Sequence, residues 1–212
     1  MNQAYGRGSV AALTQVLAPT FGADEGIDWE LLSARWKTRF PGDYIAFMRT
    51  FGAGGMSDSL EILRPLSPSD GIADGMSSAT ADARDQWPPT TAPASAPANA
   101  NAGDAVIAWG VTPAADTLCW LTSGADPDLW PVAVLRASLD APWTVYPMGM
   151  AEFLHRLILG DLDRCPLGEA TLWAAGTGRF LHWREEERRL QKGIDPWTVQ
   201  PDPLDNIEFD GP

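Results

Sequence analysis

Residue types that could carry out chemistry are few in this sequence and stand far apart. The chain has two histidines, His155 and His182, and two cysteines, Cys119 and Cys165. A metal site needs such residues at short spacings, and nucleophilic catalysis needs a recognisable base beside the nucleophile. Neither histidine has a second histidine at i+4, and Cys165 stands before a proline without a His or Asn framework. We therefore expect packing or surface histidines, and no catalytic, cofactor or metal site.

The glycine cluster at residues 52–55, GAGG, has the composition of a phosphate-binding loop. In such a loop the glycines lie between a strand and the first turn of a helix, where free N–H groups face the anion. Here they follow a predicted helix and precede a predicted strand, and no GKS or GKT accompanies them. The cluster therefore indicates a helix stop and a turn. The GTG at residues 176–178 lacks a preceding strand and a third glycine, and we interpret it in the same way.

Apolar spacing predicts the elements around these residues. Helices are expected from Ser9 to Pro19, from Asp28 to Phe40, from Pro41 to Gly52, over residues 150–160 and over residues 178–193. Strands are expected over residues 60–66, 105–111, 117–122, 131–137 and 143–147. The short links between the last four strands favour antiparallel hairpins. Residues 77–103 are rich in Ala, Pro, Thr, Ser and Asn, so we expect a flexible insertion there and an extended or disordered tail over residues 195–212.

The balance of charge is strongly acidic. In this 22.9 kDa chain of 212 residues, 28 acidic against 15 basic residues give a formal net charge of −13. Such a surface repels nucleic acid and anionic lipid, and it favours a basic partner or serves solubility alone. No apolar run of about 18 residues occurs, and the N-terminus makes a poor signal peptide. With only two cysteines, we expect a cytoplasmic protein without membrane or nucleic-acid partners.

The ten tryptophans pose a choice between core packing and base stacking. Between Thr50 and Leu135 the basic residues are Arg64 and Arg84 alone, so the aromatic–basic interleaving of nucleic-acid binders is missing. Most tryptophans fall on apolar stripes or predicted strands, which favours the core. Trp130, in the turn DPDLWP, is the expected exception, exposed and available to a partner.

The order of motifs resembles the SUKH superfamily, known from fungal cell-wall-synthesis regulators and bacterial immunity proteins. In that family a helix begins with a (L/F)P-x-D-Y-x-x-F pattern and ends in a glycine-containing turn. The matching positions here are Phe40, Pro41, Asp43, Tyr44, Phe47 and Gly52. The family's closing aromatic and x-E-F-L-x-x-L are matched by Tyr146, Glu152, Phe153, Leu154 and Leu157. The likeness covers residues 27–162; between the motifs, Gly110 and Asp116 stand near the family's glycine and acid, but a second glycine is absent.

The resemblance implies an α+β domain without catalysis, in which a single antiparallel sheet is backed by N-terminal helices and one C-terminal helix. The implied parts are a helical extension at 1–26, a SUKH-like domain at 27–165 with a flexible insertion at about 77–103, and a charged helix with an acidic tail at 166–212. Bacterial members look like immunity proteins that cover the active site of a toxin domain, often a nuclease or deaminase.

Resemblance and acidity together predict a cognate toxin or another basic protein as the partner. The residues predicted to contact it are Asp58, Glu61, Asp116, Asp126, Asp128, Trp130 and Asp140. Two alternatives stay open: an intracellular scaffold or regulator of the same fold, and a small-molecule enzyme whose site is assembled from scattered residues. A neighbouring toxin gene would favour immunity, and a deep polar pocket with a strongly shifted carboxyl or imidazole pKa would favour the enzyme. The sequence leaves the partner's identity and the oligomeric state open.

Overall fold

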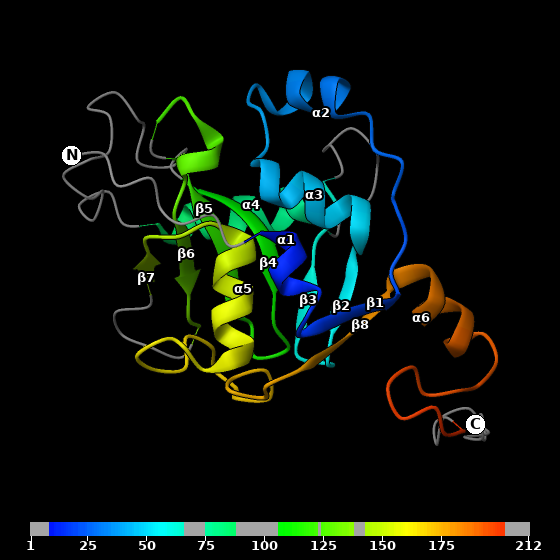
Figure 1. The fold of residues 1–212 in the computed structure, drawn as a ribbon. Helices are drawn as coiled ribbons and strands as arrows, with labels where there is room; N and C mark the ends of the chain where they lie inside the picture. The colour runs from blue at the N-terminus through cyan, green and yellow to red at the C-terminus, as the bar shows by residue number, and fades with distance from the viewer. Residues whose placement is uncertain (1–8, 66–74, 88–105, 123, 138–142, 202–212) are drawn as a thin grey trace, which may run out of the picture.

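The computed structural model describes residues 9–65, 75–87, 106–122, 124–137 and 143–201. The fold is of the expected α+β class, with helices packed around one open, eight-stranded mixed sheet (Figure 1). The strands are β1 (Leu17–Phe21), β2 (Gly54–Met56), β3 (Leu60–Ile62), β4 (Val106–Val111), β5 (Thr117–Leu121), β6 (Val132–Leu135), β7 (Trp143–Tyr146) and β8 (Gly178–His182). The helices are α1 (Val10–Leu13), α2 (Trp29–Trp36), α3 (Gly42–Thr50), α4 (Met76–Gln86), α5 (Met150–Leu159) and α6 (Trp183–Leu190), with a 3₁₀ turn η3 (Pro127–Leu129).

The sheet runs in the order β1–β8–β2–β3–β4–β5–β6–β7. Every pairing from β8 to β7 is antiparallel, which confirms the hairpins predicted for the last four strands. Strand β1, however, pairs with β8 in parallel. The sheet is therefore mixed, and the expectation of a purely antiparallel sheet is wrong at this edge.

The C-terminal segment supplies an internal strand of the sheet. The helix predicted over residues 178–193 begins only at Trp183, because residues 178–182 form β8 between β1 and β2. Phe180 and Leu181 of this strand are buried, and its backbone groups pair with both neighbours. The segment is thus part of the sheet rather than an appended charged helix.

The first helix is shorter than predicted. Ser9 caps it, since its Oγ accepts a hydrogen bond from the N–H of Ala12 at 3.2 Å, but the helix ends at Leu13. Pro19 therefore does not end a helix; it lies inside β1. Proline cannot donate to a ladder of hydrogen bonds, so it is tolerated in an edge strand such as this one.

A helix replaces the first part of the insertion that was expected to be flexible. In α4, Oγ1 of Thr80 accepts a hydrogen bond from the N–H of Ala108, and Nε of Arg84 donates to the carbonyl of Val106. The small Ala83 is fully buried and lets the helix lie close to the sheet. Polar contacts with the backbone of β4 thus hold a helix that has little apolar surface. Residues 88–105 of the expected insertion lie outside the described residues.

Helices cover both faces of the sheet. Helices α1, α3 and α5 contact one another on one face, and α4 packs on β4 and β5 from the other (Figure 1). All of β6 and nearly all of β4 is buried, as expected for strands covered on both faces. On the α3–α5 face, the ring of Tyr44 lies 4.9 Å from that of Trp120, and Phe153 lies 6.2 Å from Trp109. These aromatics form the centre of the core.

The two motifs that carry the family resemblance meet in space. Asp43, in the first turn of α3, accepts a hydrogen bond on Oδ2 from the N–H of Ala151 at the start of α5, at 3.0 Å. A Cβ on Gly149 would lie 2.7 Å from the same oxygen, so a larger residue there would have to displace the carboxylate. Burial raises the pKa of Asp43, against the opposing effect of these backbone hydrogen bonds. The carboxylate therefore joins α3 to α5.

Several predicted helix ends are confirmed. Asp28 caps α2 by accepting a hydrogen bond from the N–H of Leu31 at 3.0 Å. Gly52 adopts the left-handed conformation just after α3, with φ +74°, and Gly160 does so after α5, with φ +77°. The GAGG cluster is accordingly a helix stop that leads into β2.

Candidate functional site

The residues predicted to contact a partner lie at two opposite ends of the sheet. Because neighbouring strands are antiparallel, the β2–β3 and β4–β5 turns share one end, while the β5–β6 connection lies at the other. Asp58, Glu61 and Asp116 belong to the first end, and Asp126, Asp128 and Trp130 to the second. Asp140 lies outside the described residues. The predicted set therefore does not form one continuous face.

Two members of the set are buried. Trp130 is 4% exposed, and its Nε1 donates a hydrogen bond to the carbonyl of Gly124 at 2.9 Å. Its expected exposure is wrong, because the 3₁₀ turn η3 rotates the neighbouring Leu129 outward instead, to 49% exposure. Asp116 is 1% exposed and accepts a hydrogen bond from the N–H of Gly168. Asp116 therefore holds the loop that follows α5 through this hydrogen bond, and its carboxylate does not face solvent.

The two exposed acids at the second end are helix caps. Asp126 accepts a hydrogen bond on Oδ1 from the N–H of Asp128 at 3.2 Å, which opens η3. Oδ1 of Asp128 accepts from the N–H of Gly42 at 2.6 Å, at the start of α3. Both carboxylates therefore stabilise local structure through these hydrogen bonds, and their binding to a partner stays a prediction.

At the first end the structure brings three acids together. We call this site the acidic groove: Asp58 in the β2–β3 turn, Glu61 on β3 and Glu186 on α6 line a hollow of about 260 Å³, with Trp197 on its wall. Asp58 has φ +58° and follows Ser57 at φ +51°, a left-handed pair suited to the tight turn of a hairpin. Glu186 and Trp197 did not emerge from the sequence, because α6 reaches the groove only through the pairing of β8 with β2.

The acids of the groove have no basic neighbour among the described residues that line the hollow, since none of these is Lys or Arg. Burial raises the pKa of Glu61. Burial also raises the pKa of Glu186, and the charges of Glu61 and Asp58 raise it further. A cation placed in the groove would relieve this repulsion, and the Trp197 ring adds an aromatic surface beside it.

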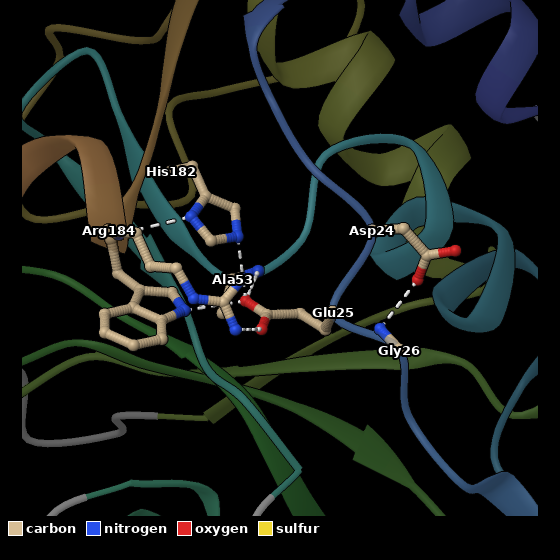
Figure 2. A network of polar contacts seen from close by, with 7 residues as sticks. Asp24, Glu25, Gly26, Ala53, His182 and Arg184 are labelled. Carbon is tan, nitrogen blue, oxygen red and sulfur yellow. Dashed lines mark hydrogen bonds and ion pairs between the residues drawn. The ribbon is translucent and has the colours of Figure 1, made fainter.

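A second polar cluster is centred on a buried carboxylate, that of Glu25, whose side chain is 1% exposed (Figure 2). Its Oε1 accepts hydrogen bonds from the N–H of Ala53 at 3.1 Å and from Nε1 of Trp183 at 2.7 Å. Its Oε2 accepts from Nη2 of Arg184 at 3.2 Å. These contacts tie the loop before α2 to the α3–β2 turn and to the start of α6. The cluster therefore anchors the C-terminal segment to the rest of the fold.

His182 completes this cluster and is 3% exposed. Its Nδ1 accepts a hydrogen bond from the N–H of Arg184 at 3.2 Å, which places the ring proton on Nε2. Nε2 lies 3.0 Å from Oε1 of Glu25, but without the alignment of a good hydrogen bond. Burial lowers the pKa of His182, and Arg184 and Arg64 lower it further, while Glu25 opposes the shift. The imidazole is thus held neutral in an enclosed position, and it packs rather than faces a pocket.

The protonation of His182 gives a direct prediction. We expect its imidazole to titrate below the ordinary value of 6.5, and to carry its proton on Nε2 when neutral. Since the unfolded chain binds that proton more readily, the stability contributed is complete above about pH 6.5 and falls as the pH drops toward the folded pKa. Long-range ¹⁵N–¹H NMR across pH 4.5 to 8 measures both properties. A titration midpoint above 6.5, or a neutral form protonated on Nδ1, would contradict the described cluster.

The pair of Glu25 and His182 was not predicted from the sequence. The two residues are far apart in the chain, and neither lies in a pattern that carries chemical meaning. In the part of the chain that the structure describes, no group of three or more His, Cys, Asp or Glu side chains is arranged to hold a metal ion. None of the helices within the described ranges is long and apolar enough to cross a membrane. In comparisons with family models, curated proteins and solved structures, nothing matches this chain.

Proposed function

We propose that this chain is a non-catalytic immunity protein, which binds a cognate toxin domain and covers its active site with an acidic surface. The toxin is a nuclease or deaminase, whose substrate-binding surface is basic. The observation that carries the proposal is the acidic groove, where Asp58, Glu61 and Glu186 surround a hollow lined by no described basic residue. The net charge of −13 adds a long-range attraction for a basic partner to the local charge of the groove.

The mechanism follows from the charge of the groove. Lysine or arginine side chains that a nuclease uses to hold phosphates would enter the hollow and pair with the three carboxylates. Relief of the repulsion among these acids makes binding favourable, and long-range attraction speeds association. The neighbouring backbone then blocks the substrate's path. Because the pKa values of Glu61 and Glu186 are raised, acidification would protonate them early and weaken the complex.

The test is co-expression of the chain with the product of its neighbouring gene. We expect the neighbour alone to arrest growth, and we expect the pair to grow normally and to co-purify in a salt-sensitive complex. A triple variant, Asp58→Lys, Glu61→Lys and Glu186→Lys, should lose protection and weaken binding at least 100-fold, which is about 2.7 kcal/mol. Isothermal titration calorimetry at two salt concentrations measures the affinity.

A matched triple variant controls for total charge. Glu30→Lys, Asp82→Lys and Asp163→Lys reverse three exposed acids outside the groove and change the net charge equally. This control should protect almost as well as the wild type. If both triple variants bind alike, the groove is not the contact surface. If the neighbour is harmless and does not bind, the immunity function is excluded, and a scaffold with another partner becomes the working hypothesis.

A further inference from the structure

A second hollow, of about 310 Å³, lies between the loop before α2, helix α2, the chain just after β3 and the start of α6. We call it the arginine pocket, after Arg35, Arg64 and Arg184, which line it. Its volume is at the lower end of the range of small-molecule sites. A concentration of arginines is unexpected in a chain with 28 acidic and 15 basic residues.

Arg64 and Arg184 of this pocket keep N–H donors that its two carboxylates do not occupy. Glu25 lines the pocket, but its two oxygens already accept from Ala53, Trp183 and Arg184. Asp28 also lines it and is engaged in capping α2. Arg64 forms no ion pair with a described residue; its guanidinium lies over the ring of Trp183, 5.3 Å from the centroid. Its in-plane N–H donors are therefore left for another acceptor.

Arg184 is a second arginine of the pocket whose guanidinium lies over the Trp183 ring. Its guanidinium lies 4.7 Å from the centroid of Trp183, and 52% of its side chain remains exposed. Only Nη2 is used by Glu25, so further N–H groups are available to a ligand. The positive charges of Arg64 and Arg184 lower the pKa of His182, against the larger opposing effect of Glu25. The imidazole of His182 is therefore close enough to respond to a change of charge in the pocket.

The other wall of the pocket is apolar. Ile27, Leu31, Leu32 and Pro65 line it, and Leu31 is 49% exposed. An exposed leucine beside arginine donors suits a ligand with a charged head and an apolar body. A planar carboxylate matches the fork of a guanidinium in two parallel hydrogen bonds.

We propose that the arginine pocket binds a small organic acid, whose carboxylate pairs with Arg64 and Arg184 and whose short apolar chain lies against Leu31 and Leu32. This site is separate from the acidic groove, and the proposal does not rest on the immunity function. The same two segments contribute to both sites. The segment of β3 carries Glu61 to the acidic groove and Arg64 to the arginine pocket, and α6 carries Glu186 and Arg184 in the same way. The molecule therefore presents a cation-binding and an anion-binding surface at the two ends of β3.

The test uses potassium hexanoate as the probe, followed by ¹H–¹⁵N NMR on the full chain. We expect saturable binding in the millimolar range, with shifts of the Arg64 and Arg184 side-chain signals and of the Leu31 amide. Saturation should also raise the pKa of His182, because the bound anion offsets the charges that lower it. Hexan-1-ol and inorganic phosphate serve as the apolar-only and charge-only probes, and each should bind at least tenfold more weakly.

The variant Arg64→Met removes the guanidinium and its cation–π contact with Trp183 but keeps an unbranched apolar stem, and it should weaken hexanoate binding at least tenfold. Arg179→Met is the matched control, because Arg179 also lies over a tryptophan, Trp197, but outside the pocket. If Arg64→Met does not fold, Arg64→Lys replaces it, with an expected loss of about threefold. The proposal is overturned if hexanoate shows no saturable binding, if hexanol or phosphate binds equally well, or if the Arg64 variant binds like the wild type.

Discussion

Glu25→Ala is expected to destabilise the protein by about 3–5 kcal/mol, the cost of removing one partner from a buried charged cluster. The change leaves the N–H of Ala53 and Nε1 of Trp183 without their acceptor, and it leaves Arg184 without its carboxylate. The N–H of Ala53 and Nε1 of Trp183 would be buried and unpaired, or water would have to enter the core, whereas the exposed Arg184 would turn to solvent. Urea unfolding followed by circular dichroism and tryptophan fluorescence measures the loss.

The neighbouring residue provides the control for this prediction. Asp24 is exposed, and its Oδ1 accepts a hydrogen bond from the N–H of Gly26 at 2.9 Å, within its own loop (Figure 2). Asp24→Ala should therefore cost no more than about 1 kcal/mol. Glu25→Gln, which keeps one acceptor oxygen but loses the charge, should fall between the two. Equal stabilities for the Asp24 and Glu25 alanine variants would show that the buried cluster does not anchor the C-terminal segment.

Gly54→Ala is expected to lower the free energy of unfolding by about 4 kcal/mol or more and to disturb the pairing of β2 with β8. Gly54 has φ +149°, a conformation that residues with a Cβ rarely adopt. It also faces His182 across the β2–β8 ladder, where an added Cβ would overlap the carbonyl oxygen of Leu181 and lie 2.9 Å from the Cα of His182. Strain and steric overlap therefore add together. The midpoint of urea unfolding, or the soluble yield if folding fails, reports the effect.

Gly75→Ala separates these two contributions. Gly75 has nearly the same φ, +146°, but no described atom lies within 4 Å of the position that its Cβ would take. Its replacement should show the backbone strain alone, about 1–3 kcal/mol. The difference between the two variants then measures how closely β8 approaches β2. If Gly54→Ala were no worse than Gly75→Ala, the close approach of the two strands would be refuted.

The features predicted correctly from the sequence are those decided within a few residues. Asp28 caps α2 because its own side chain reaches the N–H three residues on, and Gly52 ends α3 because only its own φ must change. The four strands over residues 105–147 follow one another closely in the sequence, and each pairs with the next in an antiparallel ladder, as proximity along the chain favours. Local rules of this kind can be followed along a single sequence.

The features that were missed depend on contacts between distant segments. The sequence of residues 178–182 is compatible with a strand or a helix. These residues form a strand because their backbone groups pair with both β1 and β2. Helix α4 is held by Thr80 and Arg84 bonding to the backbone of β4, which composition does not reveal. The exposure of Leu129 in place of Trp130 depends on the rotation of one 3₁₀ turn.

The candidate site could be predicted only in part for the same reason. Asp58 and Glu61 were predicted as contact residues from the family resemblance and the acidity of the chain, and the structure places them together on the β2–β3 hairpin in the acidic groove. Glu186 completes the groove from α6, which the sequence did not connect with that hairpin. The Glu25–His182 pair is likewise assembled by the fold, because β8 carries His182 to the loop before α2.

The position of β8 also has a consequence for how the chain is made. Its partner β2 leaves the ribosome first, and residues 57–177 must follow before β8 appears. At about 5–20 residues per second, this interval lasts roughly 6 to 24 seconds. During that time β2 exposes a pairing edge that is buried in the finished protein, and such edges invite association between nascent chains. The nascent chain therefore depends on the segment that carries β8 to cover this edge and to limit aggregation.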